Sequence, residues 1–153
     1  MNEAHITELG LESFRRFLNK YSRVERMAFD FAGHRLHPVE VHTLVFIADK
    51  GRSYASEISR GTGVTRGAVS QVVGKLEKKG LLEREKDESN ALRVLLKPSP
   101  KGLEVAQAHT AFHLSQDKEF FSFLSALDAE QKRLIKELFE EMDCWMDKYF
   151  VDP

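Results

Sequence analysis

Apolar residues recur three or four positions apart through most of this chain, and that spacing is typical of amphipathic helices. The first such pattern covers residues 6–31, where we expect one long helix. Pro38 is suited to the first turn of a second helix, and Gly51 ends the pattern that Pro38 begins. Two shorter helices are predicted after it, at residues 54–60 and 65–79, separated by a Gly-Thr-Gly turn.

The hydrophobic period changes after Gly80, which ends the last of these helices. Residues 81–86 and 92–97 have strand character and are joined by the polar, turn-forming residues 87–90, so we predict a β-hairpin. Helices followed by a hairpin are the order of a winged helix-turn-helix domain. In such a domain the last helix before the hairpin enters the major groove of DNA.

The C-terminal third of the chain returns to helical spacing. Ser99 is suited to cap a helix with Pro100 in its first turn, and we expect this helix to reach about Ser125. A last helix is predicted after a cap at Asp128. The predicted fold class is mainly α with a small β-hairpin wing (α+β), a winged helix-turn-helix with long terminal helices. We expect an N-terminal helical segment, a winged domain and a C-terminal helical segment, at residues 1–35, 36–98 and 99–153.

The predicted helix at residues 65–79 has two faces, one apolar and one formed by polar or small residues. Arginine and lysine can contact phosphates or guanine edges, glutamine can pair with adenine, and glycine allows a close approach to DNA. A solvated helix face has a similar composition, but the neighbouring turn and hairpin favour a DNA-reading helix. We expect DNA contacts from Thr65, Arg66, Gly67, Ser70, Gln71, Lys75 and Lys78 in the helix, and from Arg84, Lys86 and Arg93 in the hairpin.

Charge is distributed unevenly along the chain. The formal net charge is only −1, but the segment from Arg60 to Lys101 contains ten lysines and arginines against five acidic residues. Such a segment favours a nucleic-acid partner. No apolar run is long enough to cross a membrane, and Cys144 is the single cysteine, so we expect a soluble, cytoplasmic protein. No nucleophile, base and orienting group recur at a usable spacing, so we expect no enzymatic activity.

Four short motifs stand out in the sequence. They are Ser56-Glu57-Ile58, Gly63-Val64-Thr65-Arg66-Gly67-Ala68-Val69-Ser70, Lys75-Leu76-Glu77-Lys78-Lys79-Gly80-Leu81-Leu82-Glu83-Arg84 and Ser99-Pro100-Lys101-Gly102. Together they resemble the MarR family of bacterial transcription regulators, in which the helix after the wing starts with Thr-Pro-Lys-Gly. The resemblance implies a regulator, expected to be a repressor, that binds a palindromic operator as a homodimer. It also implies that the first helix and the last two helices form the dimer interface.

Both terminal regions are rich in large apolar residues at helical spacing, more than a small winged domain is expected to cover. The alternative is an ordinary core within one chain. We favour a homodimer interface, in agreement with the resemblance. The residues expected in that interface are Phe14, Phe17, Tyr21, Leu138, Met142 and Trp145.

The tip of the predicted wing departs from the family pattern. MarR-family wings usually have Asp-Arg-Arg at the tip, whereas this chain has Asn90-Ala91-Leu92, with Arg93 one position later. The usual arginine for the minor groove is therefore not in its place. We expect Arg84, Lys86 and Arg93 to contact the DNA backbone only.

Two histidines, His109 and His113, lie four residues apart in the predicted helix after the wing, so they face one side of it. Imidazoles at this spacing can bind one zinc ion when other ligands complete a tetrahedral site. Together with His42 they resemble the zinc-sensing branch of the MarR family. That resemblance implies an acidic ligand from the first helix, for which Glu25 is the nearest candidate and Glu40 the next. The alternative is that these are surface or interface histidines.

The effector is open at this stage between zinc and a small aromatic or phenolic molecule, which MarR proteins commonly bind between the dimerisation helices and the winged domain. Neither choice requires a cofactor for DNA binding. A winged helix used for protein contacts, without specific DNA binding, is the alternative function. Arg66, Gln71 and Lys75 argue against that alternative. A thiol-oxidation sensor is disfavoured because the reactive N-terminal cysteine of that branch is absent.

Overall fold

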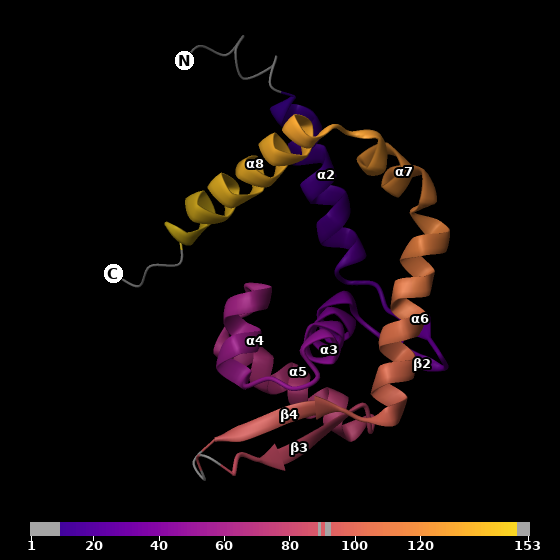
Figure 1. Cartoon of the computed structure of the whole chain (residues 1–153), viewed down its shortest axis with the longest axis vertical. Coiled ribbons are helices and arrows are strands. Elements are labelled where there is room, and N and C mark those ends of the chain that lie inside the picture. Colours follow the sequence, from indigo (N-terminus) through magenta and orange to yellow (C-terminus); the bar gives the residue numbers. More distant parts are fainter. Residues whose placement is uncertain (1–9, 89, 91–92, 150–153) are drawn as a thin grey trace. The chain divides into compact units, whose positions relative to one another are not determined.

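The computed structural model of the chain describes residues 10–88, 90 and 93–149, which contain seven helices and two antiparallel hairpins (Figure 1). The predicted fold class, mainly α with a β-hairpin wing, is confirmed. The chain divides into two compact units, residues 1–110 and 111–153. No described helix combines the length and apolar character needed to span a membrane. In chain order the elements are α2 (Leu11–Val24), β1 (Phe29–Phe31), β2 (His34–Leu36), α3 (Pro38–Lys50), α4 (Ala55–Thr62), α5 (Arg66–Lys78), β3 (Leu82–Lys86), β4 (Val94–Pro98), α6 (Pro100–Gln116), α7 (Lys118–Ala126) and α8 (Ala129–Asp147).

The first described helix, α2, is shorter than the sequence pattern predicts. It ends at Val24, and the last residues of the expected helix form strand β1, which pairs with β2 in a hairpin. The turn between the strands contains Gly33 at a φ of 79°, a conformation that favours glycine. Phe31 and Leu36 are both buried. The prediction of one helix through residue 31 is therefore wrong, because alternate burial along two short strands outweighs helical spacing here.

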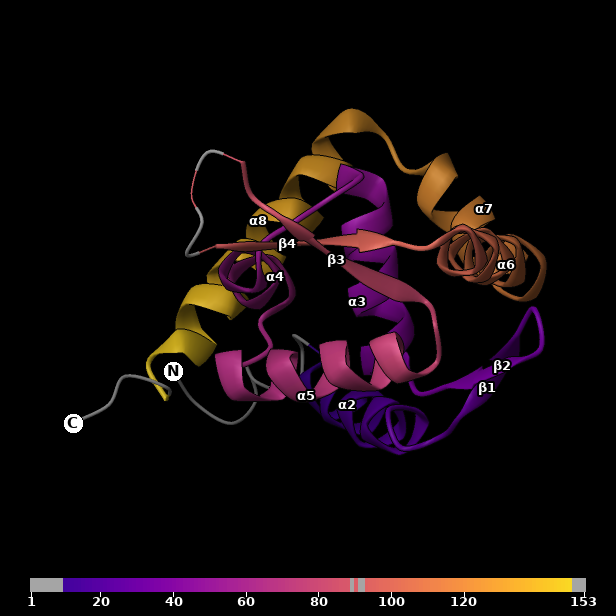
Figure 2. The ribbon, with the colours of Figure 1, turned by 90° about the horizontal axis from the view of Figure 1, so that it is seen from below.

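Helices α3, α4 and α5 contact one another and enclose the main core of the chain (Figure 2). The three helices lie where the sequence pattern predicts them, and Pro38 is the first residue of α3. Helix α3 contacts both other helices and β4, so it is buried on several sides. The fully buried side chains of the three helices are Val41, Leu44, Ile47, Ile58, Val69 and Leu76, together with Thr43.

The wing consists of β3 and β4, with Leu82 opposite Pro98 and Lys86 opposite Val94. The predicted hairpin is therefore confirmed. An additional bridge joins Ser53 to Leu96 through two backbone hydrogen bonds of 2.9 Å. This bridge attaches the wing to the segment that leads into α4. At the tip, residues 89, 91 and 92 lie outside the described residues. Of the residues that depart from the family pattern, only Asn90 and Arg93 are therefore described.

Helix α6 begins in close contact with the end of α5. The Ser99 hydroxyl accepts a hydrogen bond from the Gly102 N–H at 3.0 Å and donates one to the Gly80 carbonyl at 2.7 Å. A Cβ atom on Gly102 would lie 2.1 Å from the Leu81 carbonyl oxygen. Only glycine permits this approach, so the Ser-Pro-Lys-Gly motif fixes where α6 begins.

The helix expected from Pro100 to about Ser125 is interrupted at Asp117. Helix α6 ends at Gln116, and α7 begins at Lys118. Asp117 has φ −102° and ψ 20°, and its carboxylate accepts a hydrogen bond from His113 Nδ1 at 2.5 Å. The prediction of one uninterrupted helix is wrong because a side-chain hydrogen bond to Asp117 accompanies a non-helical backbone there.

Helix α8 begins after Asp128, as the sequence predicts. The Asp128 carboxylate accepts a hydrogen bond from the Gln131 N–H at 2.8 Å, and the Gln131 side chain accepts one from the Asp128 N–H at 3.0 Å. This reciprocal pair is a capping box. Among the described residues, neither α7 nor α8 contains a buried one.

Candidate DNA-binding surface and histidine cluster

Helix α5 has the two faces that its sequence predicts. The inner stripe consists of Val69, Val72, Val73 and Leu76, all buried against the rest of the winged domain. Thr65 is the N-cap, and its hydroxyl accepts a hydrogen bond from the Ala68 N–H at 3.3 Å. The remaining N–H groups of the first turn, with the positive end of the helix dipole, suit a phosphate.

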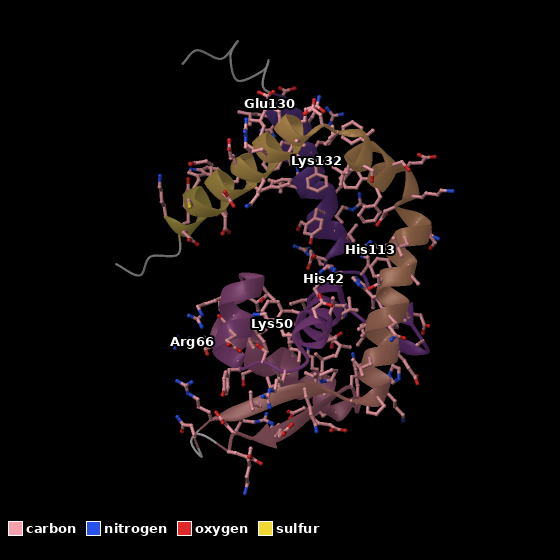
Figure 3. The ribbon with its side chains drawn as sticks, in the orientation of Figure 1. His42, Lys50, Arg66, His113, Glu130 and Lys132 are labelled. Carbon is pink, nitrogen blue, oxygen red and sulfur yellow. The ribbon has the colours of Figure 1, made fainter. Side chains whose placement is uncertain are left out.

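The outer face of α5 is exposed and carries positive charge, with Arg66 at its start (Figure 3). Its exposed residues are Arg66, Gly67, Ser70, Gln71, Lys75 and Lys78. At Gly67 and Gly74, an added Cβ would meet nothing within 4 Å, so packing inside the chain does not require glycine at either position. The small size of these residues leaves room for a partner to approach the outside of the helix.

The wing places its predicted DNA-contacting residues in different environments. Arg84 is engaged within the chain, since its guanidinium binds both carboxylate oxygens of Glu77 on α5, at 2.5 and 2.9 Å. That ion pair lowers the pKa of Glu77 and raises that of Arg84. Lys86 is exposed. Arg93 lies over the ring of Tyr54, with 5.3 Å between its guanidinium carbon and the ring centroid.

Tyr54 and Asp87 form the base of the wing, a role that the sequence does not suggest for either. The Tyr54 hydroxyl donates a hydrogen bond of 2.5 Å to the buried Asp87 carboxylate, and this bond raises the pKa of Tyr54. The Asp87 N–H also donates to the Arg93 carbonyl at 3.5 Å. Arg93 is therefore held from two sides, by its backbone and by an aromatic ring. Tyr54 and Asp87 are 33 residues apart in the chain, so local spacing does not predict their contact.

The histidines predicted as metal ligands are partly brought together. His42 on α3 and His109 on α6 have ring centroids 5.1 Å apart, and their closest ring nitrogens lie within 4.8 Å. His109 is buried and also contacts the edge of Phe31, at 5.3 Å between ring centroids. Because α6 is one continuous helix at this point, His113 lies one turn after His109 on the same side of it.

This donor set fits a zinc ion. Three imidazoles leave one position of a tetrahedral site for a carboxylate or a water. His113 Nδ1 is hydrogen-bonded to the Asp117 carboxylate, and a carboxylate on one ring nitrogen is a common partner of an imidazole whose other nitrogen binds a metal. Asp117 is a residue that sequence reasoning missed, although its spacing of four from His113 is a usable signal. Figure 3 labels His42 on α3 and His113 on α6.

The two acidic residues expected as zinc ligands, Glu25 and Glu40, form other contacts. Glu25 accepts a hydrogen bond from Tyr21, and this bond, together with burial and the negative charge, raises the pKa of Tyr21 to about 12. Glu40 is buried and pairs with Lys79 at 3.0 Å. Neither belongs to the group of possible metal ligands that contains the three histidines. A carboxylate ligand from Glu25 remains a prediction.

Glu40 nevertheless has a clear structural role. Its carboxylate accepts hydrogen bonds from the His37 N–H at 2.8 Å and from Lys79 Nζ at 3.0 Å. Burial raises the pKa of Glu40, but these hydrogen bonds and the positive charges of Lys79 and Lys75 outweigh burial and hold it below its ordinary value. Lys79, at the end of α5, thus faces α3 rather than the outer surface.

Comparison with known proteins finds a relative that is similar in sequence and several solved structures that have a similar fold. A sequence model of the MarR family matches residues 36–91. A curated HTH-type transcriptional regulator of Bacillus subtilis, YcgE, is 33% identical over 63 residues, which are 41% of this chain and 41% of YcgE. The match therefore spans about two fifths of the length of this relative.

Two solved structures are similar over nearly the whole chain. One is FabT of Streptococcus pneumoniae in complex with DNA, with a TM-score of 0.63 and 19% identity over 97% of this chain and 99% of FabT. The other is ZitR of Lactococcus lactis, a zinc-responsive MarR family member, with a TM-score of 0.64 and 16% identity over 92% of this chain and 99% of ZitR. At these identities the likeness shows the fold alone. The predicted fold is thus confirmed, and residues 36–91 of this chain match the sequence model of the MarR family.

Proposed function

We propose that this protein is a sequence-specific DNA-binding transcription regulator that binds a palindromic operator as a homodimer. The observation that carries the proposal is the outer face of α5, where Arg66, Gln71 and Lys75 are exposed beside small residues. Arginine and glutamine recognise base edges in the major groove, and lysine contacts phosphates. A dimer lying across an operator excludes other proteins from that DNA, so we further propose that it represses transcription.

Homodimer formation is supported by helices that lack a core of their own. Among the described residues, α2, α7 and α8 contain none that is buried. Phe17 on α2 is 56% exposed, and Trp145 on α8 is 50% exposed. Apolar surface of this extent needs a partner, and a second copy of the chain is the partner that a palindromic operator requires. We therefore propose residues 1–35 and 99–153 as the dimerisation segments and residues 36–98 as the DNA-binding domain.

The proposed dimer interface contains the six residues expected from the sequence. Phe17, Tyr21, Leu138 and Trp145 are exposed, whereas Phe14 and Met142 are half-buried. Aromatic residues are enriched in interfaces because they cover a large apolar area. Phe14 and Phe17 also stack on one another, with 6.5 Å between ring centroids, which presents a continuous aromatic face.

DNA binding is tested on the full chain. Operator duplexes are selected from a random pool, and their affinity is measured by fluorescence anisotropy over a series of salt concentrations. The logarithm of the binding constant should fall by about 0.9 per phosphate contact for each tenfold rise in salt. An affinity that does not change with salt would instead indicate a winged helix that contacts a protein.

Base reading is tested by variants of the outer face of α5. Arg66→Ala and Gln71→Ala should each cost about 1 to 3 kcal/mol on the selected operator and much less on random DNA. Lys78→Ala should weaken binding to both duplexes alike. Lys101→Ala is the matched control, because Lys101 is exposed at the start of α6 and not on α5. Equal losses on both duplexes for Arg66→Ala would refute its base-reading role.

We also propose zinc as the effector, bound by His42, His109 and His113. The proximity of His42 and His109 supports the site, and α3 and α6 are the two helices it would join. Helix α3 packs against α5, and α6 begins against the end of α5, so joining them would favour one position of the DNA-reading helix. Zinc would thereby shift the population toward one conformation and change operator affinity.

The zinc site is tested by titrating zinc into the metal-free protein and measuring bound metal and operator affinity. His42→Ala combined with His113→Ala should abolish stoichiometric binding, and this pair avoids the buried His109. Asp117→Asn should weaken zinc binding about tenfold, because it orients a ligand without being one. His34→Ala, in the β1–β2 hairpin, is the matched control. Zinc binding that survives in the double variant, or that leaves operator affinity unchanged, would contradict the proposal.

A further inference from the structure

A small cavity of about 110 Å³ lies between α5 and the wing, entirely within the first compact unit. Helix α5 contacts strand β3, and in Figure 2 the helix and both wing strands face the viewer. Six residues line this cavity, which we call the wing niche: Ala55, Ser70, Val73, Arg84, Val94 and Leu96. None of the three histidines is among them, so the niche is separate from the proposed zinc site.

The wing niche has an apolar floor and an exposed rim. Val73 on α5 and Leu96 on β4 are each only 3% exposed, and they form the floor. On the rim, Val94 of β4 is 43% exposed, and Ala55, the first residue of α4, is also exposed. Ser70 lines the niche and belongs to the outer face of α5 as well. The niche therefore adds an apolar hollow to the face that we propose reads DNA.

Contacts within the chain hold the walls of the niche in place. Arg84 on β3 binds both carboxylate oxygens of Glu77 on α5, which joins the wing to that helix. The bridge between Ser53 and Leu96 joins β4 to the segment that leads into α4. Because α4, α5 and the wing are already connected, a partner would not have to order the niche in order to enter it.

The size of the niche limits what can occupy it. Sites for small molecules have volumes of about 300 to 1,000 Å³, well above that of the niche. A water molecule takes up about 30 Å³ in the liquid, so the niche has room for roughly four groups of that size. Part of a sugar ring fits this space, whereas a whole base or a drug-sized effector does not. The apolar floor favours carbon atoms over a phosphate.

The position of the niche indicates which part of DNA reaches it, an inference that rests on the proposed function. When α5 lies in the major groove and the wing lies at the neighbouring minor groove, one DNA backbone passes between them, because a backbone separates adjacent grooves. We propose that the niche holds one deoxyribose of that backbone, with its C2′ methylene against Val73 and Leu96. Arg84 has five N–H donors, of which Glu77 accepts two, so it can also donate to the adjoining phosphate.

A sugar in the niche has two consequences for recognition. It fixes the position of α5 along the groove, because sugar and phosphate contacts set the register of a protein on a duplex. It also makes the site selective for DNA. A ribose would place its 2′-hydroxyl against apolar side chains, where the hydroxyl would lose its hydrogen bonds to water.

The proposal is tested with the selected operator, in which a single ribonucleotide replaces a deoxyribonucleotide at one position at a time. Fluorescence anisotropy measures the affinity of the full-length protein for each duplex. At one sugar of each half-site the added hydroxyl should weaken binding about tenfold, and at other positions by less than about twofold. Operator binding that no single ribonucleotide weakens selectively would overturn the proposal and leave the proposed function in place. Absence of DNA binding would overturn both.

Variants assign the sensitive sugar to the niche. Ala55→Leu extends an exposed side chain into the niche without a change of charge, so the ribonucleotide loss at the sensitive position should fall below about twofold. Ser56→Leu, the matched control, adds the same side chain at the next exposed position, which does not line the niche, and should keep the tenfold loss.

Val94→Ala is a second variant, which widens the niche instead of filling it. Water can then reach the added hydroxyl, so the ribonucleotide loss should fall to about threefold. This variant decides the matter if Ala55→Leu does not fold or does not bind the operator. A tenfold loss that persists in every variant that binds would overturn the proposal.

A second set of duplexes distinguishes a sugar from a base as the occupant. Deoxyuridine in place of thymidine removes the 5-methyl group, which is an apolar part of DNA that the major groove presents. We expect that no deoxyuridine substitution has an effect that Ala55→Leu abolishes. A deoxyuridine loss that is present in the wild type and absent in Ala55→Leu would assign the niche to a thymine methyl group and overturn the proposal.

Discussion

The winged domain and the outer helices α2, α7 and α8 differ in how far their apolar side chains are buried. In α3 and α5, most large apolar side chains are buried, and several are fully so. Among the described residues of α2, α7 and α8, none is buried, although these helices carry many phenylalanines and leucines. The first region can be stable with its own core. The second has the composition of a core but exposes its large apolar side chains.

The largest expected effect is on the free energy of unfolding, when a side chain in the core of the winged domain is truncated. Leu44→Ala removes a fully buried side chain, so the free energy of unfolding should fall by about 3 kcal/mol. Leu134→Ala on α8, where the residue is 65% exposed, should change it by less than about 0.5 kcal/mol. Urea denaturation of dilute protein measures both values. A loss at Leu134 equal to that at Leu44 would show that α8 has core contacts within its own chain.

The next effect concerns the partner of the outer helices. Leu138→Asp with Trp145→Asp places two charges on the apolar face of α8 and should convert the proposed dimer to a monomer. Operator affinity should then fall about 100-fold, because two linked domains no longer bind together. Sedimentation and anisotropy measure the two quantities. Lys136→Asp, on the opposite face of α8, is the control and should remain dimeric, and a dimer that tolerates both charges would place the interface elsewhere.

A smaller effect is expected at the ion pair that connects α3 to α5. Glu40→Gln should lower the free energy of unfolding by about 2 kcal/mol at pH 7, because it weakens charge-assisted hydrogen bonds. The pKa of Glu40 is lower in the folded protein, so folding favours its ionised form. This contribution is present above the unfolded pKa of about 4.3 and is lost as the pH falls through the folded value.

Denaturation at a series of pH values measures this linkage. Below about pH 5 the wild type should lose stability more steeply than Glu40→Gln, and the two curves should converge at acid pH. Parallel curves over this range would show that Glu40 does not contribute in the ionised form.

The smallest expected effect is at the base of the wing. Tyr54→Leu removes both the ring beneath Arg93 and the hydroxyl bound to Asp87, and should lower operator affinity about threefold. Tyr54→Phe keeps the ring and should have a smaller effect. If the two variants are equal, the hydroxyl rather than the ring positions Arg93. Anisotropy on the selected operator distinguishes these outcomes.

Much of the winged domain could be predicted from sequence because its signals are local. The cap at Thr65, the apolar stripe of α5 and the start of α6 at Pro100 each depend on neighbouring residues. The β1–β2 hairpin was not predicted because Ala28 and Phe31 also fit helical spacing after Val24. The interruption at Asp117 was missed for a related reason, since the apolar spacing continues on both sides of it.

The candidate sites were less predictable because they join distant segments. His109 and His113 could be paired by spacing, but the contact between His109 and His42 arises only when α6 packs beside α3. The sequence predicts that Arg84 contacts DNA, yet in the structure its guanidinium pairs with the Glu77 carboxylate.

The close contact of Gly102 with the Leu81 carbonyl has a consequence for how the proposed regulator could change by mutation. A methyl group at position 102 must displace the start of α6 from the end of α5. It would leave His42, His109, His113 and the outer face of α5 chemically intact. Gly102→Ala is therefore expected to uncouple the proposed zinc site from the proposed DNA-binding face while it leaves the residues of both in place.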